Sequence, residues 1–177
     1  MDEFVRIPEE RIGVLVGPKG AVKREIEKKT GTRIEIDSES GEVEISSKKE
    51  DALKFYKAVD IVKAIARGFS PEHAISLLKD SFILEIIKIA EYAGKSEKAI
   101  AAKRARIIGK HGTAREEIEN DTGCFISVYG KTISIIGHAD KIEKTRKAVE
   151  MLMEGAKHST AFEFLKKDKK KSDKFEL

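Results

Sequence analysis

Residues 12–36, IGVLVGPKGAVKREIEKKTGTRIEI, decide the fold of the first half of this chain. An apolar segment leads into a loop with glycines at 17 and 20. A run of helix-forming residues follows, and a Thr-Gly pair separates it from the alternating sequence RIEI. Glycine permits backbone conformations that tight loops need, and Gly31 can supply the left-handed residue that ends many helices. The stretch therefore predicts a helix, a glycine loop, a second helix and a strand.

The same pattern returns at residues 106–128, RIIGKHGTAREEIENDTGCFISV. At an offset of 92 residues the glycines of the two loops coincide, and so do further pairs: Ile26 with Ile118, Thr30-Gly31 with Thr122-Gly123, Ile34 with Ile126, and Ile36 with Val128. In the helix beyond, the offset falls to 90, where Lys57-Ala58-Val59 matches Lys147-Ala148-Val149. A unit of about 65–70 residues is too long for a solenoid repeat, so the chain contains two related domains.

The first unit predicts the order strand, helix, loop, helix, strand, strand, helix. Alternating residues indicate strands at 4–8, 33–37 and 42–46. Ser47 and Glu50 have the spacing of a capping box. The helix after them, which Gly68 ends, carries an apolar stripe that we expect to cover the sheet: Ala52, Phe55, Val59, Val62 and Ala66.

The second unit predicts the same order, starting with a strand at 84–92 and ending with a helix that Asp140 and Glu143 cap. Between the units, Ser70 and Pro71 have the pattern of a helix start. After Phe164 the chain is rich in lysine and lacks an apolar period. We therefore expect a first domain at 1–69, a linking helix at 70–82, a second domain at 83–160 and a basic, disordered tail at 161–177.

The composition is that of a soluble globular protein, with 40% hydrophobic and 37% charged residues. No apolar run approaches the roughly 18–20 residues of a membrane helix, and the first residues do not resemble a signal peptide. Cys124 is the single cysteine, which excludes an internal disulfide and a thiolate metal cluster. The four histidines have no metal-ligand spacing. We expect a cytoplasmic protein with no metal, no cofactor and no membrane.

Positive charge gathers around the two glycine loops. Residues 95–115 contain seven Lys or Arg against one acidic residue, Glu97, and residues 11–24 contain four Lys or Arg and no acidic residue. A solvated helix face usually mixes both signs, so this local excess favours an anionic partner. Two glycines let a sugar-phosphate backbone approach closely, and the helix that starts at the second glycine directs its N–H groups to the same point.

The repeated order of elements, with I-G-x-x-x-G-x-x-G in the first unit followed by T-G and an alternating strand, resembles the K-homology (KH) RNA-binding domain of type I. The resemblance occurs twice and covers about four-fifths of the chain. It implies an α+β fold of two tandem βααββα domains, each with a three-stranded antiparallel sheet covered by three helices. KH domains clamp single-stranded RNA with the GxxG loop and place its bases against a neighbouring groove.

The resemblance implies two sets of interface residues. Those expected at the RNA backbone are Gly17, Pro18, Lys19, Gly20, Lys23, Arg104, Arg106, Gly109, Lys110, His111, Gly112 and Arg115. Those expected to line the base groove are Ile12, Gly13, Val16, Ile34, Ile36, Ile107, Ile108, Ile126 and Val128. Pro18 removes one N–H from the first loop, whereas the second loop has Lys110 and His111 between its glycines. We expect the second domain to dominate phosphate binding.

Several segments together resemble the two-KH-domain proteins of small ribosomal subunit assembly and pre-rRNA processing, in an archaeal form: ARGFSPEHAISLLKD, ISVYGKTISIIG and MLMEGAKHSTAFEFL. This resemblance implies binding to small-subunit (pre-)rRNA near its 3′ end, together with a PIN-domain endonuclease or a translation initiation factor subunit. Two alternatives remain open at this stage. One is a general RNA chaperone or exosome accessory; the other is a protein-docking KH module that acts with a translation factor.

Nothing in the sequence predicts an enzyme. Gly94-Lys95-Ser96 has the ending of a phosphate-binding P-loop, but the glycine required five residues earlier is replaced by Ile89. No nucleophile is paired with a base, and the acidic residues lie on helix faces mixed with lysines. We interpret the chain as a binding protein.

Overall fold

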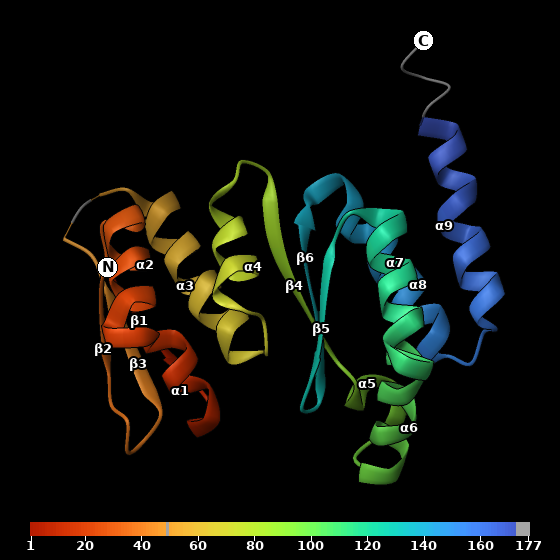
Figure 1. Cartoon of the computed structure of the whole chain (residues 1–177), viewed down its shortest axis with the longest axis horizontal. Helices are drawn as coiled ribbons and strands as arrows, with labels where there is room; N and C mark the ends of the chain where they lie inside the picture. Colours follow the sequence, from red (N-terminus) through yellow and green to blue (C-terminus); the bar gives the residue numbers. More distant parts are fainter. Residues whose placement is uncertain (49, 173–177) are drawn as a thin grey trace. The chain divides into compact units, whose positions relative to one another are not determined.

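Each half of the chain forms a three-stranded antiparallel sheet with its helices on one side, as Figure 1 shows. This computed structural model describes residues 1–48 and 50–172, with side chains up to Lys167. The chain divides into the units Met1–Leu84 and Glu85–Leu177, so the boundary falls inside the strand β4. The α+β fold of two βααββα domains is as expected.

The first unit has its strands in the spatial order β1-β3-β2. Its elements are β1 (Asp2–Arg6), α1 (Glu9–Val16), η1 (Pro18–Gly20), α2 (Ala21–Thr30), β2 (Arg33–Ile36), β3 (Glu42–Ser46), α3 (Ala52–Ala66), α4 (Pro71–Ile75) and η2 (Ser76–Leu78). The central strand pairs Val43 with Val5 on one side and with Ile36 on the other. Because successive strand residues point to opposite faces, Val43 and Ile45 are buried under the helices while Glu42 is exposed.

The apolar stripe of α3 packs as expected for Phe55, Val59, Val62 and Ala66, which are buried, but Ala52 is exposed. The predicted Ser47–Glu50 cap is wrong. The N-cap is Asp51, whose carboxylate accepts the N–H of Lys54 at 3.1 Å. Asp51 lies directly before the first helical residue, which is the position from which a side chain can reach the third N–H of the helix.

The predicted linking helix begins where expected and ends early. Ser70 is its N-cap and accepts the N–H of His73, with Pro71 as the first helical residue. The helix α4 ends at Ile75 and the 3-10 turn η2 continues it to Leu78, whereas residue 82 already belongs to β4. Ala74 and Leu77 are fully buried and α4 packs against α3. The segment is therefore part of the first unit's core, not a free connection.

The second unit has its strands in the order β4-β6-β5. Its elements are β4 (Phe82–Lys88), α5 (Ala90–Ala93), α6 (Glu97–Ile108), η3 (Lys110–Gly112), α7 (Thr113–Thr122), β5 (Phe125–Tyr129), β6 (Thr132–His138), α8 (Ala139–Met153) and α9 (His158–Ser172). The strand expected at 84–92 ends at Lys88, because the short helix α5 follows. The expected Asp140 cap is also wrong: His138 is the N-cap of α8, and its Nδ1 accepts the N–H of Asp140 at 3.3 Å.

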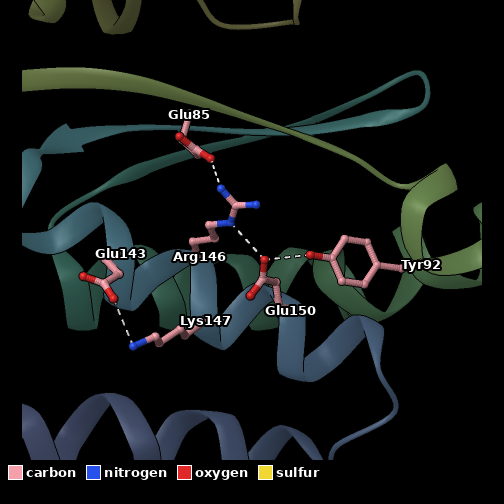
Figure 2. Close-up of polar contacts among 6 residues, drawn as sticks. All are labelled: Glu85, Tyr92, Glu143, Arg146, Lys147 and Glu150. Carbon is pink, nitrogen blue, oxygen red and sulfur yellow. Dashed lines mark hydrogen bonds and ion pairs between the residues drawn. The ribbon is translucent and has the colours of Figure 1, made fainter.

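A network of polar side chains joins α5, α8 and β4 (Figure 2). The Tyr92 hydroxyl donates to Glu150 Oε1 at 2.6 Å, and Arg146 Nε donates to the same oxygen at 2.9 Å. Arg146 also pairs with Glu85 of β4. The hydroxyl that donates to the Glu150 carboxylate lowers the pKa of Glu150, and the same bond raises the pKa of Tyr92. One carboxylate thus holds the inserted helix α5 on α8.

The tail expected at 161–177 is not disordered over the residues that the structure describes. Residues up to Ser172 form the helix α9, which packs against α7 and α8. Ala161 and Leu165, one helical turn apart, are fully buried in the core of the second unit. Residues 173–177 lie outside the described part of the chain. The prediction was wrong because the lysines of this segment masked an apolar face only a few residues long.

Candidate nucleic-acid interface

The two glycine loops have the same backbone conformation. Each first glycine has φ near 71° with extended ψ, and each second glycine is left-handed. The residue before the second glycine is also left-handed, with φ of 52° at Lys19 and 56° at His111. Such a conformation is uncommon outside glycine, Asn and Asp, so its occurrence at both loops marks one specific turn. The duplication seen in the sequence is therefore a duplication of the loop geometry.

The first glycine of each loop is required by packing as well as by φ. A Cβ at Gly17 would lie 2.4 Å from Cγ2 of Val22, and one at Gly109 would lie 2.6 Å from Cβ of Ala114. A Cβ at Gly112 would meet nothing within 4 Å. The first glycine thus lets each loop close onto the helix that follows it, while Gly112 leaves open space in front of the start of α7.

Both helix starts lack a side-chain cap. Gly20 is the N-cap of α2 and Gly112 is the N-cap of α7, and neither can supply a side-chain acceptor. The first N–H groups of a helix have no partner within the helix, and together with the helix dipole they attract anions. In the second loop the Thr113 hydroxyl donates to the carbonyl of Lys110 at 2.7 Å, which fixes that loop. Each loop can therefore receive a phosphate.

Charged side chains surround these helix starts. Lys19, Lys110 and His111 are exposed on the loops themselves. Lys23 pairs with Glu27 at 3.2 Å, so its charge is partly neutralised. Arg24, which the sequence did not single out for the site, lies over the first loop, because a Cβ at Gly20 would be 2.9 Å from its Nη1. The first loop thus gains a cation that the GxxG motif alone does not reveal.

The Arg106 side chain, expected at the RNA backbone, binds main-chain carbonyls of its own unit. Its Nε donates to the carbonyl of Leu152 at 2.8 Å and its Nη2 donates to that of Ala156. One guanidinium thus ties the last turn of α8, which ends at Met153, to the segment that follows it. Arg11 does the same in the first unit, where it binds the carbonyls of Ile65 at 2.8 Å and Phe69 at 2.6 Å. Both arginines hold the helix before the loop onto the long helix of its unit.

Arg104 and Arg115, also assigned to the RNA backbone, are half-exposed. Their Nε atoms are shielded from solvent and find no hydrogen-bond partner within the described residues. Arg115 occupies in α7 the position that Lys23 occupies in α2, one turn from the loop. Both arginines lie on the helices that flank the second loop, α6 and α7.

The expected base groove separates into two groups of residues. Ile34, Ile107 and Ile126 are buried and belong to the cores, so their assignment as groove-lining residues is wrong. They were misassigned because an alternating strand does not reveal which face the helices cover. The remaining residues keep surface available for a ligand, with Gly13 exposed and the others partly exposed: Ile12, Val16, Ile36, Ile108 and Val128.

The edge strands β2 and β5 present backbone groups beside this surface. Glu27 Oε1 accepts the N–H of Ile34 at 2.8 Å, and Glu119 Oε1 accepts that of Ile126 at 2.8 Å. These N–H groups therefore point away from the central strand. Backbone groups alternate in direction along an antiparallel strand, so residues two apart direct theirs to the same side. The N–H and C=O of Ile36 and Val128, two residues further on, therefore also point to the open edge. They can hydrogen-bond the edge of a nucleobase, a contact that the sequence did not predict.

Other chemistry finds no support. Gly94 ends α5 with a positive φ and the Ser96 hydroxyl caps α6, so the apparent P-loop ending connects two helices. Within the described residues, no group of His, Cys, Asp and Glu side chains has the arrangement of a metal site. No helix in the described part of the chain combines the length and apolar character that a membrane span requires.

Comparison with known proteins identifies both units. Residues 2–60 match the family model of the KH domain, and residues 83–170 match a model described as a eukaryotic type KH domain, type I. A KH domain-containing protein of Methanocaldococcus jannaschii is 44% identical over 96% of this chain and 74% of its own length.

Three crystal structures resemble the whole chain. Dim2p from Pyrococcus horikoshii is 46% identical with a TM-score of 0.88, covering 94% of this chain and 99% of its own. A complex of a/eIF2alpha, aDim2p and rRNA from the same organism contains a chain that is 47% identical, with a TM-score of 0.90 over 97% of this chain and 95% of its own. A protein of unknown function from Aeropyrum pernix is 35% identical, with a TM-score of 0.93 over 99% and 94%.

KH domains are modules that bind single-stranded RNA, and they carry no catalytic centre of their own. The family models account for both glycine loops, and the relatives extend the match over nearly the entire chain. The chain belongs to the family of archaeal proteins with two type I KH domains that includes Dim2p.

Proposed function

We propose that this protein is a cytoplasmic factor of small ribosomal subunit biogenesis that binds single-stranded (pre-)16S rRNA near its 3′ end. The observation that carries the proposal is the pair of GxxG loops with one backbone conformation, each beside an open strand edge. The choice of rRNA as the ligand rests on the related Dim2p of Pyrococcus horikoshii, which has been solved with rRNA. Similarity over 97% of this chain supports carrying that ligand over.

The RNA would be held in two ways. Phosphates at the loops meet the positive ends of the dipoles of α2 and α7, together with the exposed Lys19, Lys110 and His111. Bases lie on the partly exposed apolar residues and hydrogen-bond the backbone of Ile36 or Val128. Only unpaired bases can reach a strand edge in this way, which is why the ligand is a single strand.

The test compares a short RNA that matches the 3′ end of small-subunit rRNA with a scrambled RNA of equal composition. Binding is measured at near-physiological salt for the wild type and for a variant with Lys110→Asp and His111→Asp. Asp tolerates the left-handed conformation of His111, so the variant reverses charge without straining the loop. We expect tight binding to the matched RNA that the variant loses.

Other results would redirect the assignment. Equal binding of both RNAs would support a general RNA chaperone or exosome accessory. No binding of either RNA would support the protein-docking module. An unaffected charge-reversal variant would remove the second loop from the interface.

A translation initiation factor subunit is the partner that a specific observation favours, since the related aDim2p has been solved with a/eIF2alpha and rRNA together. The PIN-domain endonuclease rests on the family resemblance alone. Titration of the archaeal initiation factor subunit into the protein, with and without RNA, tests the first partner. Binding in both conditions would mean that the partner uses a surface other than the RNA interface.

A further inference from the structure

The helix α9 forms a hollow beside the second glycine loop. Its volume is about 400 Å³, and it is lined by Gly109, Lys110, Thr113, Ala114, Glu117, His158 and Phe162. Four of these residues belong to the loop and the start of α7, and His158 and Phe162 come from α9. The volume lies in the range of sites that hold small organic ligands. The loop that receives a phosphate therefore also forms one wall of a cavity.

The hollow and the base groove lie on different flanks of α7. Glu119, which binds the edge strand β5, marks the groove side. Thr113 and Glu117 line the hollow and are about 120–160° away from Glu119 around the helix, at 100° per residue. Between these flanks, the buried Ile118 faces the core. An RNA strand that runs from the base groove across the second glycine loop would next reach the hollow.

The chemistry of the hollow suits an aromatic ring that donates hydrogen bonds. Phe162 is partly buried and supplies an apolar wall, with the His158 ring 6.1 Å away. Two polar groups of α7 and α9, on Glu117 and His158, can accept hydrogen bonds, and Lys110 adds a cation from the loop. His158 Nε2 donates to the carbonyl of Arg106 at 2.8 Å, which leaves its Nδ1 as an acceptor when the ring is neutral. Glu117 is a carboxylate held by Lys166 at 3.1 Å.

We propose that this hollow binds the base of the nucleotide adjacent to the phosphate held by the second loop, and that it prefers a base with an exocyclic amino group. The base stacks on Phe162 and donates its amino group to Glu117, as carboxylates accept from the amino group of cytosine. Uracil has a carbonyl in place of the amino group of cytosine, and this carbonyl would face the Glu117 carboxylate, so uracil is disfavoured. The proposal rests on the RNA-binding function proposed above and adds to it the nature of one recognised base.

The first unit provides an internal control. The equivalent flank of α2 is lined by residues of α2 alone: Ala21, Arg24, Glu25, Lys28 and Lys29. These residues supply charge but no aromatic wall, and Glu25, in the position of Glu117, pairs with Lys29. The two units therefore share the loop conformation but differ in the hollow, so we expect only the second unit to bind this additional base.

A tryptophan in place of Phe162 tests the site directly. The chain contains no tryptophan, so Phe162→Trp gives one fluorophore on the wall of the hollow. Oligo(C) and oligo(U), each about eight nucleotides long to exceed the roughly four that one KH domain clamps, are titrated against this variant in the full chain. We expect oligo(C) to quench the tryptophan more strongly and at lower concentration than oligo(U). A matched reporter, Tyr56→Trp, lies on an exposed position of the first unit and should respond to neither RNA.

The amino-group preference is tested by Glu117→Gln, with Glu25→Gln as the matched variant and Lys166→Gln as a control for the lost ion pair. We expect Glu117→Gln to weaken oligo(C) about fivefold and to leave oligo(U) nearly unchanged, since Gln keeps an acceptor but loses the charge that strengthens this hydrogen bond. Both control variants should bind both RNAs as the wild type does. Thermal melting of each variant shows that the fold is retained.

The outcomes separate this site from the general function. If a Gly112→Asp loop variant loses all RNA, but neither the fluorescence of the Phe162→Trp variant nor the affinities of Glu117→Gln distinguish oligo(C) from oligo(U), the hollow is not a base site and the RNA-binding function stands. If the loop variant binds both oligomers normally, the proposed function fails together with this site. A Lys166→Gln effect equal to that of Glu117→Gln would assign the change to the packing of α9 instead.

Discussion

The carboxylate of Glu119, on the helix α7 that starts at the second loop, accepts the backbone N–H of Ile126 in the edge strand β5 at 2.8 Å. Glu27 and Ile34 repeat the bond at the same distance in the first unit. Each glutamate stands on the helix that starts at the glycine loop and fixes that helix to the edge strand. The separation between the phosphate-binding loop and the base-facing edge is thereby set by one side chain in each unit.

Removal of this side chain should loosen the edge strand. Glu119→Ala leaves the Ile126 N–H without its acceptor in a partly buried place, which costs about 1–2 kcal/mol. Amide exchange should show faster exchange at Ile126, and urea unfolding should show the lower stability. Glu119→Gln keeps an acceptor and should change stability by only a few tenths of a kcal/mol. Equal stability of the wild type and Glu119→Ala would contradict this role.

The two glycines of a loop should differ in their tolerance of alanine. Gly109→Ala places a methyl group 2.6 Å from Cβ of Ala114 at a positive φ, so we expect a loss of at least ~2 kcal/mol in unfolding free energy. Gly112→Ala meets open space and should lose only about 1 kcal/mol from backbone strain. Urea denaturation of both variants measures the difference. A Gly112 variant as unstable as the Gly109 variant would mean that packing is not the cause.

The helix α9 should be required for the stability of the second unit. Leu165 is fully buried in the core, and Leu165→Ala should lower the unfolding free energy by about 2–5 kcal/mol, the usual range for such a cavity. Lys167→Ala, on an exposed position of the same helix, is the control and should be neutral. Chemical denaturation distinguishes the two. A disordered tail would make both substitutions silent.

Most of the fold could be predicted because local signals repeat. Two glycine loops, two Thr-Gly helix ends and alternating strands all agree on one order of elements. The helix α9 could not be found in the same way, since Ala161 and Leu165 form only one turn of apolar spacing before the lysines begin. One turn of apolar spacing is too short to predict a helix, and its role is visible only in the folded structure, where α9 packs on α7 and α8.

The site was predicted less well for a similar reason. The loop residues follow from the motif, but the fate of a side chain depends on distant parts of the chain. Arg106 binds carbonyls 46 and 50 residues further on, which no local pattern reveals. His158 and Phe162 reach the second loop only because α9 folds back onto α7. The sequence locates a phosphate loop; the tertiary structure decides which side chains surround it.

The Tyr92–Glu150 bond should make stability depend on pH at both ends of the range. The pKa of Glu150 is lowered from 4.5, so its contribution is present above that value and is lost as the pH falls through the folded pKa. The pKa of Tyr92 is raised from 10.0, so the bond persists below pH 10 and is lost as the pH rises through the folded pKa.

Tyr92→Phe removes the hydroxyl and should lower stability by under ~1 kcal/mol at neutral pH, because the network is partly exposed. The difference from the wild type should shrink as the pH falls from 4.5 through the folded pKa of Glu150, and as the pH rises from 10.0 through the folded pKa of Tyr92, because the wild type then loses the same bond. Melting temperatures of both proteins across this range provide the measurement. A difference that stays constant with pH would exclude Glu150 as the partner.

The two loops should contribute unequally to RNA affinity. In the second loop Lys110 and His111 both carry donors, whereas Pro18 stands in the place of Lys110 in the first loop and lacks an N–H. Lys110→Asp should therefore weaken binding about tenfold or more and reduce the slope of affinity against salt, while Lys19→Asp should weaken it about two- to threefold. Fluorescence anisotropy with one single-stranded RNA at several salt concentrations measures both. A larger loss for Lys19→Asp would reverse the ranking and make the first loop, with Arg24 above it, the principal phosphate site.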